Sequence, residues 1–261
     1  ISSLEFIENE YSNDNSKKNI THMFELPVFD YSKPVMLLKT LVSYVTDKND
    51  IILDFFSGSA TTAHAVIQQN FQDVYNGKQG KRKFIMVQLP ELTDKKSEAY
   101  KAGYENICEI GKERIRRAGK MEYESVCGTA GSSMRWDSEK RKNDKNYPCP
   151  ENVDIGFRVL KCDSSNMKEV YYTPDDYEMS LFDSLEDNIK EDRTPEDLLF
   201  QVMLDLGILL SSKIEETTIF GKKVFKVDGN YLIACFDKNV TEDVILSLIH
   251  ISEPTRPEPI S

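Results

Sequence analysis

The residues best suited to chemistry form a run of small and hydroxyl-bearing side chains next to an apolar segment. The run is Asp54-Phe-Phe-Ser-Gly-Ser-Ala-Thr-Thr62, and it overlaps the end of the apolar segment Ile51–Phe56. A chain that leaves a strand and turns tightly into a helix exposes N–H groups that bind polar or anionic ligands. Gly58 permits a close backbone approach, and its small neighbours leave room for a ligand. The run is therefore a candidate ligand-binding turn, although one glycine alone is more typical of a plain structural turn.

The elements that must position this run alternate between strands and helices. Ile51–Phe56 and Phe84–Leu89 are continuous apolar runs of strand length, typical of parallel strands buried on both faces. Helical spacing predicts helices that begin at Lys33-Pro34, at Ala60 and at Ser97, the last running to about Ala118. This alternation is typical of a doubly wound α/β domain.

The second half of the chain has a different organisation. Residues 121–153 lack clean periodicity and are predicted to be a linker that contains Trp136. A strand is expected over 155–159, and Thr194-Pro195 is expected to start a helix that runs through Leu210. Two tight turns then predict a meander of three strands over 217–220, 223–227 and 231–236, followed by a helix from Thr241. These elements indicate a small α+β domain.

Charge and cysteine usage narrow the class of protein. Residues 1–150 contain 22 basic and 21 acidic side chains, whereas residues 151–261 contain 11 and 23, within a net charge of −11. Because phosphate neutralisation supplies most non-specific affinity for DNA, the acidic second half is a poor candidate for touching it. The five scattered cysteines indicate reduced thiols and a cytoplasmic protein. No apolar run reaches the length of a membrane span.

The run 54–62 resembles the cofactor loop of amino-methylating DNA methyltransferases, D-x-F-x-G-S-G-T-T. Its form Phe-Ser-Gly-Ser-Ala-Thr-Thr is similar to that of the modification subunits of type III restriction-modification systems, which are adenine-N6 DNA methyltransferases of the permuted class. Ala60 stands where this pattern has its last glycine and predicts a slightly re-aimed loop, because alanine disfavours positive φ. Four further blocks agree with this family in order, at 29–34, 83–91, 109–117 and 156–166. The resemblance spans about residues 22–245.

The resemblance implies S-adenosyl-L-methionine as the cofactor. It places Lys33 and Pro34 at the wall of the cofactor's methionine end. It assigns the loop itself to Asp54, Phe55, Phe56, Ser57, Gly58, Ser59, Ala60 and Thr61. The ribose hydroxyls are assigned to Gln88 or to Glu91, with Gln88 slightly favoured. His64 is interpreted as a packing or hydrogen-bonding residue rather than a catalyst, and no metal ligand is predicted.

The sequence carries no catalytic residue for methyl transfer to adenine. That reaction needs a base flipped out of the duplex, and the family grips its amino nitrogen with an Asp/Asn-Pro-Pro-Tyr/Phe segment. No two prolines are adjacent in this sequence. In the permuted class the catalytic segment and the target-recognition region precede the cofactor loop, so they are expected before Ile1. The chain is therefore interpreted as part of a site-specific adenine methyltransferase, truncated before its catalytic segment and inactive alone.

The predicted fold is a partial Rossmann-like methyltransferase sheet with an open edge, followed by the α+β domain. Residues 1–20 are predicted to be disordered or a linker remnant, and residues 21–120 to be the cofactor-binding part. The linker 121–153 then leads to the C-terminal domain, residues 154–246. Residues 247–261 resemble translated sequencing-adapter sequence and are predicted to be a non-native tail, which removes His250 from consideration.

The resemblance also implies partners. They are double-stranded DNA, bound through the upstream region, the helicase-nuclease restriction subunit, and a second copy of the intact protein. Two other hypotheses stay open. The chain could be a non-catalytic assembly module for the restriction subunit, or another nucleotide-binding Rossmann-type enzyme. The loop lacks G-x-G-x-x-G, which argues against the second.

Overall fold

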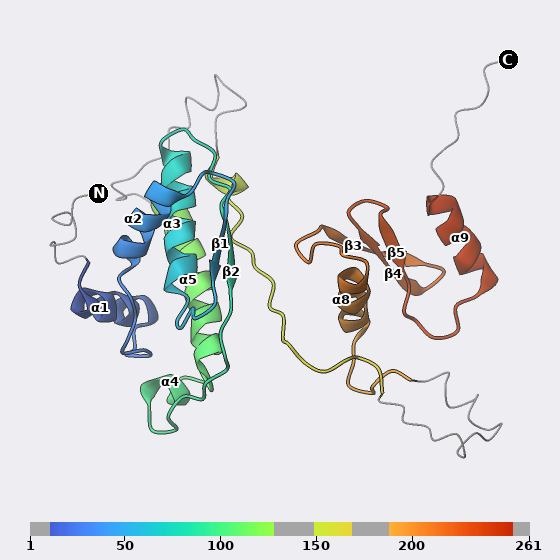
Figure 1. The fold of residues 1–261 in the computed structure, drawn as a ribbon, viewed down its shortest axis with the longest axis horizontal. Helices are drawn as coiled ribbons and strands as arrows, with labels where there is room; N and C mark the ends of the chain where they lie inside the picture. The colour runs from blue at the N-terminus through green and yellow to red at the C-terminus, as the bar shows by residue number, and fades with distance from the viewer. Residues whose placement is uncertain (1–10, 128–148, 169–187, 253–261) are drawn as a thin grey trace. The chain divides into compact units, whose positions relative to one another are not determined.

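The computed structural model describes residues 11–127, 149–168 and 188–252, and the chain divides into two compact units, 1–159 and 160–261 (Figure 1). The ranges outside the described residues are 1–10, 128–148, which contains Trp136 of the expected linker, 169–187 and 253–261. Among the described helices, none has the length and apolarity to cross a membrane.

The first unit is built around two parallel strands. In it, β1 (Ile51–Asp54) pairs with β2 (Lys83–Met86), so that Leu53 lies opposite Ile85. The described part of the sheet has only these two strands, and each therefore keeps an open edge, as predicted. This confirms the parallel pairing and a mixed α/β architecture, while a larger Rossmann-like sheet stays a prediction.

Helices cover one face of this sheet. The helix α3 (Thr61–Tyr75) contacts β2, α2 (Val35–Val45) and α5 (Ile107–Cys127), and Figure 1 shows α3 and α5 running along the strands. The core between these elements includes buried side chains from α1, α3 and α5, namely Ile20, Phe24, Ile67, Phe71, Ile110 and Ile115. Phe84 and Met86 of β2 are half-buried against it.

The expectation that both strands are buried on both faces is wrong for the described residues. Exposure alternates along each strand, and Ile51, Leu53 and Ile85 are 61%, 57% and 50% exposed. The reason is that helices cover only the face that carries Phe84 and Met86. The opposite face is an apolar surface without a covering element in the described part of the chain.

Two helices differ from the sequence-based expectation. Residues 1–20 were expected to be disordered or a linker remnant, and residues 1–10 lie outside the described residues. From Asn13 on the expectation is wrong, because α1 (Asn13–Phe24) is a helix that Ser12 caps and that Ile20 and Phe24 anchor in the core. The single helix expected from Ser97 is instead α4 (Glu98–Lys101) and α5. Gly103, at φ +91°, breaks it, and the Asn106 side chain accepts the N–H of Glu109 in the first turn of α5.

The segment after α5 also differs from the sequence-based expectation. The 3-10 helix η3 (Pro150–Asn152) lies within the expected linker and contacts α5, which itself extends to Cys127. Residues 155–159 were expected to form a strand, but they are not paired with another strand. Side-chain packing holds the segment instead: the guanidinium of Arg116 lies 5.5 Å from the Phe157 ring centroid.

The second unit is a small α+β domain. Its antiparallel sheet has the order β3 (Ile214–Ile219), β4 (Lys222–Val227), β5 (Leu232–Ala234), which confirms the predicted meander. The helix α8 (Pro195–Asp205) begins with a capping box between Thr194 and Asp197. It ends before Leu210 because Gly207 adopts φ +69°. The helix α9 (Glu242–Ser252) extends into the segment 247–261.

Candidate functional site

The predicted ligand loop leaves the sheet at the carboxyl end of β1. Ladder hydrogen bonds continue past the strand, since the Val87 N–H donates to the Asp54 carbonyl at 2.8 Å and the Ser57 N–H to the Val87 carbonyl at 3.2 Å. Ligands of open α/β sheets bind at this edge. The loop therefore begins where the resemblance placed it.

The Asp54 carboxylate holds the loop in shape. One oxygen accepts the Phe56 N–H at 3.1 Å, and the other accepts the hydroxyl of Thr62 in the first turn of α3. Both bonds lie inside the loop. The contribution of Asp54 in this structure is therefore conformational.

The conformation of Ala60 contradicts the expectation that alanine re-aims this loop. It adopts φ +60° and ψ +40° as the N-cap residue of α3, a left-handed conformation in which glycine is the usual residue. The loop therefore keeps this conformation at a cost of about 1–2 kcal/mol rather than being re-aimed. The buried alanine methyl and the 2.7 Å bond from the Ala60 N–H to the Ser57 carbonyl offset that cost.

The start of α3 has the features of an anion-binding site. Within the described ranges no side chain caps it, so the first N–H groups of the helix have no side-chain acceptor there. Gly58 precedes it at φ +52°, and a methyl group added there would meet no atom within 4 Å. Open space thus lies beside an uncapped, partly positive helix end.

Gln88, two residues after the end of β2, fixes the loop. Its side-chain oxygen accepts the Gly58 N–H at 2.7 Å, and its amide nitrogen donates to the Leu89 carbonyl at 3.2 Å. The Glu91 side chain is exposed and has no hydrogen bond or ion pair in the described part of the chain. Of the two ribose candidates, Gln88 is therefore engaged with the loop and Glu91 is available.

Arg114 of α5 is the residue that sequence analysis missed. Its guanidinium is buried beneath the loop, and Nη1 donates to the hydroxyls of Ser32, Ser59 and Thr61 at 2.9, 2.8 and 2.7 Å. The helical period of the sequence could have indicated that Arg114 is buried, because position 114 lies four residues after Ile110 on the buried face of α5. Arg114 joins three of the blocks that sequence analysis quoted separately.

His64 completes this cluster as a packing residue. The Nε of Arg114 donates to its Nδ1 at 3.5 Å. Burial, reinforced by the charge of Arg114, lowers the pKa of His64 to about 3. The imidazole is therefore neutral at pH 7, and its Nδ1 acts as an acceptor.

The remaining predicted residues lie around this cluster. Pro34 is buried, Lys33 is exposed, and the Lys33 carbonyl accepts the hydroxyl of Ser16 at 2.6 Å. Phe55 and Phe56 are exposed, with ring centroids 5.4 Å apart. The loop thus carries two neighbouring, exposed aromatic rings.

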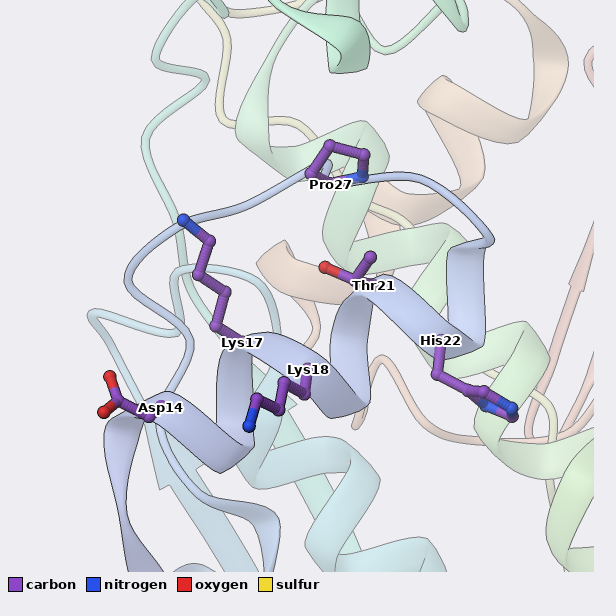
Figure 2. A pocket seen from close by; sticks show the side chains of 6 residues that line it. All are labelled: Asp14, Lys17, Lys18, Thr21, His22 and Pro27. Carbon is purple, nitrogen blue, oxygen red and sulfur yellow. The ribbon is translucent and has the colours of Figure 1, made fainter.

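A surface hollow on α1 contains none of these residues. Figure 2 shows its lining, which is Asp14, Lys17, Lys18, Thr21, His22 and Pro27. Lys17 is already paired with Asp30 at 2.6 Å. The described residues contain no group of His, Cys, Asp and Glu arranged to hold a metal ion.

Comparison with known proteins identifies a family match and several relatives. The family described as DNA methylase matches residues 5–118. The Mod subunit of the type III restriction-modification enzyme StyLTI from Salmonella typhimurium is 43% identical over 110 residues, 42% of this chain and 16% of that protein. The EcoP15I Mod subunit from Escherichia coli is 30% identical over 224 residues, 85% of this chain and 28% of that protein. The EcoPI Mod subunit from Escherichia phage P1 is 39% identical over 111 residues, 42% of this chain and 16% of that protein.

The segment that holds the loop, β1, β2 and most of α5 thus matches the family described as DNA methylase. Among such proteins, the chain is a relative of the modification subunits of type III restriction-modification enzymes. The matched segments span 28% or less of the length of these relatives.

Proposed function

We propose that this chain is the S-adenosyl-L-methionine-binding portion of a site-specific DNA adenine-N6 methyltransferase of a type III restriction-modification system. The observation that carries the proposal is the loop at the start of α3. Gln88 and Arg114 hold it from two sides, and Gly58 faces open space. A doubly wound methyltransferase sheet, of which β1 and β2 form part, belongs to the same proposal.

Each site residue has a proposed task. The loop backbone and the start of α3 receive the polar methionine end of the cofactor, with Lys33 and Pro34 as its wall. The exposed Phe55 and Phe56 offer apolar surface for the adenine ring. Because Gln88 is engaged with Gly58, Glu91 is the better acceptor for the ribose hydroxyls.

The chain's own residues bind and orient rather than react. The cofactor supplies the methyl group when it is bound. No Asp-Pro-Pro-Tyr-type segment is present to grip an adenine amino group. We therefore expect no transfer of methyl groups to DNA by these 261 residues alone.

The proposed partners follow from the relatives. All three are Mod subunits of restriction-modification enzymes, so we propose double-stranded DNA, a restriction subunit and a second Mod copy as partners in a prokaryotic cytoplasm. The alignment with the EcoP15I subunit covers 85% of the chain and so extends beyond the methylase segment. This favours the acidic second unit as the assembly module of the same protein.

The proposal is tested by replacing the glycine that faces the open space. Gly58→Ala should weaken S-adenosyl-L-methionine binding by the chain about tenfold or more, because the methyl group enters the ligand space and the left-handed conformation is strained. The measurement is isothermal titration calorimetry of the wild-type chain and the variant.

Gly103→Ala is the matched control. Gly103 also has a positive φ and also faces open space, but it lies between α4 and α5, away from the loop. The Gly103→Ala variant should bind S-adenosyl-L-methionine as tightly as the wild type. Equal affinity of Gly58→Ala and Gly103→Ala, or no binding by the wild-type chain, would contradict the proposed function.

A further inference from the structure

Arg114 carries a buried positive charge with no negative partner. Its side chain is among the most deeply buried in the molecule, at 1% exposure. In the described part of the chain no carboxylate forms an ion pair with it. Its Nη1 is satisfied by three hydroxyls and the Ser59 carbonyl, while its Nη2 has no hydrogen bond among the described residues. An isolated buried charge is costly unless it is paired.

A second buried arginine, Arg82, shows how a buried positive charge is usually compensated. Arg82 donates from Nη1 to the carboxylate of Asp73, and its other nitrogens donate to the hydroxyl and carbonyl of Thr46. Arg82 is thus compensated within the fold. Arg114 is buried more deeply, at 1% exposure against 8% for Arg82, and has no such partner among the described residues, so a bound anion would supply the missing counter-charge.

The surroundings of Arg114 indicate where that counter-charge binds. Nη1 contacts Ser59 in the loop and Thr61, the first residue of α3. The same helix end is uncapped and lies beside the open space at Gly58. The buried cation and the helix dipole therefore act at one place, and both favour an anion there.

We propose that Arg114 is a specificity-determining residue that selects a ligand carrying a carboxylate, the α-carboxylate at the amino-acid end of the cofactor. This inference rests on the proposed function and adds the group that recognises the cofactor's carboxylate. The sulfonium of the cofactor is itself positive, so the buried cation also orients the molecule with its carboxylate inward. The three hydroxyls hold the guanidinium in place without neutralising it.

The test compares two ligands that differ only in this carboxylate, S-adenosyl-L-methionine and decarboxylated S-adenosylmethionine. The wild-type chain should bind the first about tenfold or more tightly than the second, the range of one charge-assisted hydrogen bond. Arg114→Met is similar in shape and removes the charge, and should reduce this preference to within about threefold. Arg114→Lys keeps the charge and should retain most of the preference.

The outcomes separate the inference from the function on which it rests. If the wild-type chain binds neither ligand, the proposed function itself is wrong. If it binds both equally, or if Arg114→Met weakens both by the same factor, Arg114 only supports the fold and the inference fails. Circular dichroism checks folding, and Arg114→Gln replaces Arg114→Met where the latter does not fold. If neither Arg114→Met nor Arg114→Gln folds, the inference also fails, because the arginine is then required for the fold.

Discussion

At the scale of single residues, burial decides which charges the site holds. Arg114 and His64 are neighbours in one buried cluster, and only the arginine keeps its charge at pH 7. Burial lowers both pKa values, that of His64 to about 3 and that of Arg114 to about 10. Because these values lie on opposite sides of neutral pH, the cluster carries one positive charge rather than two.

The pKa of His64 predicts how stability depends on pH. The unfolded chain takes up a proton on this histidine below about pH 6.5, whereas the folded chain does so only near pH 3. This contribution to stability is therefore complete above pH 6.5 and is lost as the pH falls toward 3. Its slope is at most about 1.4 kcal/mol per pH unit.

His64→Gln should remove this component while leaving an acceptor for the Nε of Arg114. The free energy of unfolding, measured in urea at pH 5 and pH 7, should differ less in the variant than in the wild type by about 1–2 kcal/mol. His22 is exposed, so His22→Gln should behave like the wild type. The same pH dependence in His64→Gln as in the wild type would exclude a buried neutral imidazole.

At the scale of elements, the connection from α3 to β2 is fixed by side chains rather than by regular structure. Asn70 of α3 donates to the Arg82 carbonyl at 2.9 Å and accepts the Arg82 N–H at 3.1 Å. Gly80 lies against the backbone of Asn70 in this connection. A Cβ there would be 2.2 Å from the Asn70 carbonyl oxygen.

Gly80→Ala should therefore destabilise the first unit. The added methyl group forces backbone atoms apart, at a cost of about 1–3 kcal/mol or more. The readout is the urea midpoint of unfolding. Gly156→Ala is the control, because its Cβ would meet only the movable Asp154 side chain at 3.2 Å, and its effect should stay within about 0.5 kcal/mol. Equal midpoints for the two variants would show that the contact at Gly80 relaxes freely.

At the scale of the whole molecule, the dominant surface feature is the uncovered face of the β1–β2 sheet. Ile51, Leu53, Ile85 and Val87 expose between 49% and 61% of their surface on it. Apolar faces and open strand edges of this kind promote association between chains. The chain should therefore self-associate through this face when no other protein covers it.

Paired charges on this face should reduce the association. Leu53 and Ile85 are cross-strand neighbours, so Leu53→Glu combined with Ile85→Lys places an ion pair on the surface without disturbing the core. Light scattering should then show a smaller average mass at the same concentration. Ile52→Glu with Phe84→Lys, on the half-buried face, should unfold the unit instead. Unchanged scattering from the first pair would show that this face does not mediate association.

Local patterns determined much of this fold. The apolar runs at 51–56 and 84–89 predicted two parallel strands, and the glycine-containing run between them predicted the ligand loop and α3. Thr194-Pro195 and the turns of the second unit predicted a capped helix and a meander, and the structure has both. These features follow from residues close together in the sequence, because turns, caps and hydrophobic periods act over a few positions.

Tertiary structure decided the features that depend on distant residues. The bond from Arg114 to Ser32 spans 82 positions and that to Ser59 spans 55, so the helical period can place Arg114 on a buried face but cannot show that it lies beneath the loop. Gln88 meets Gly58 only because two parallel strands end at the same edge. Likewise, an apolar strand predicts burial, but whether its second face is covered depends on which other elements are present to pack against it.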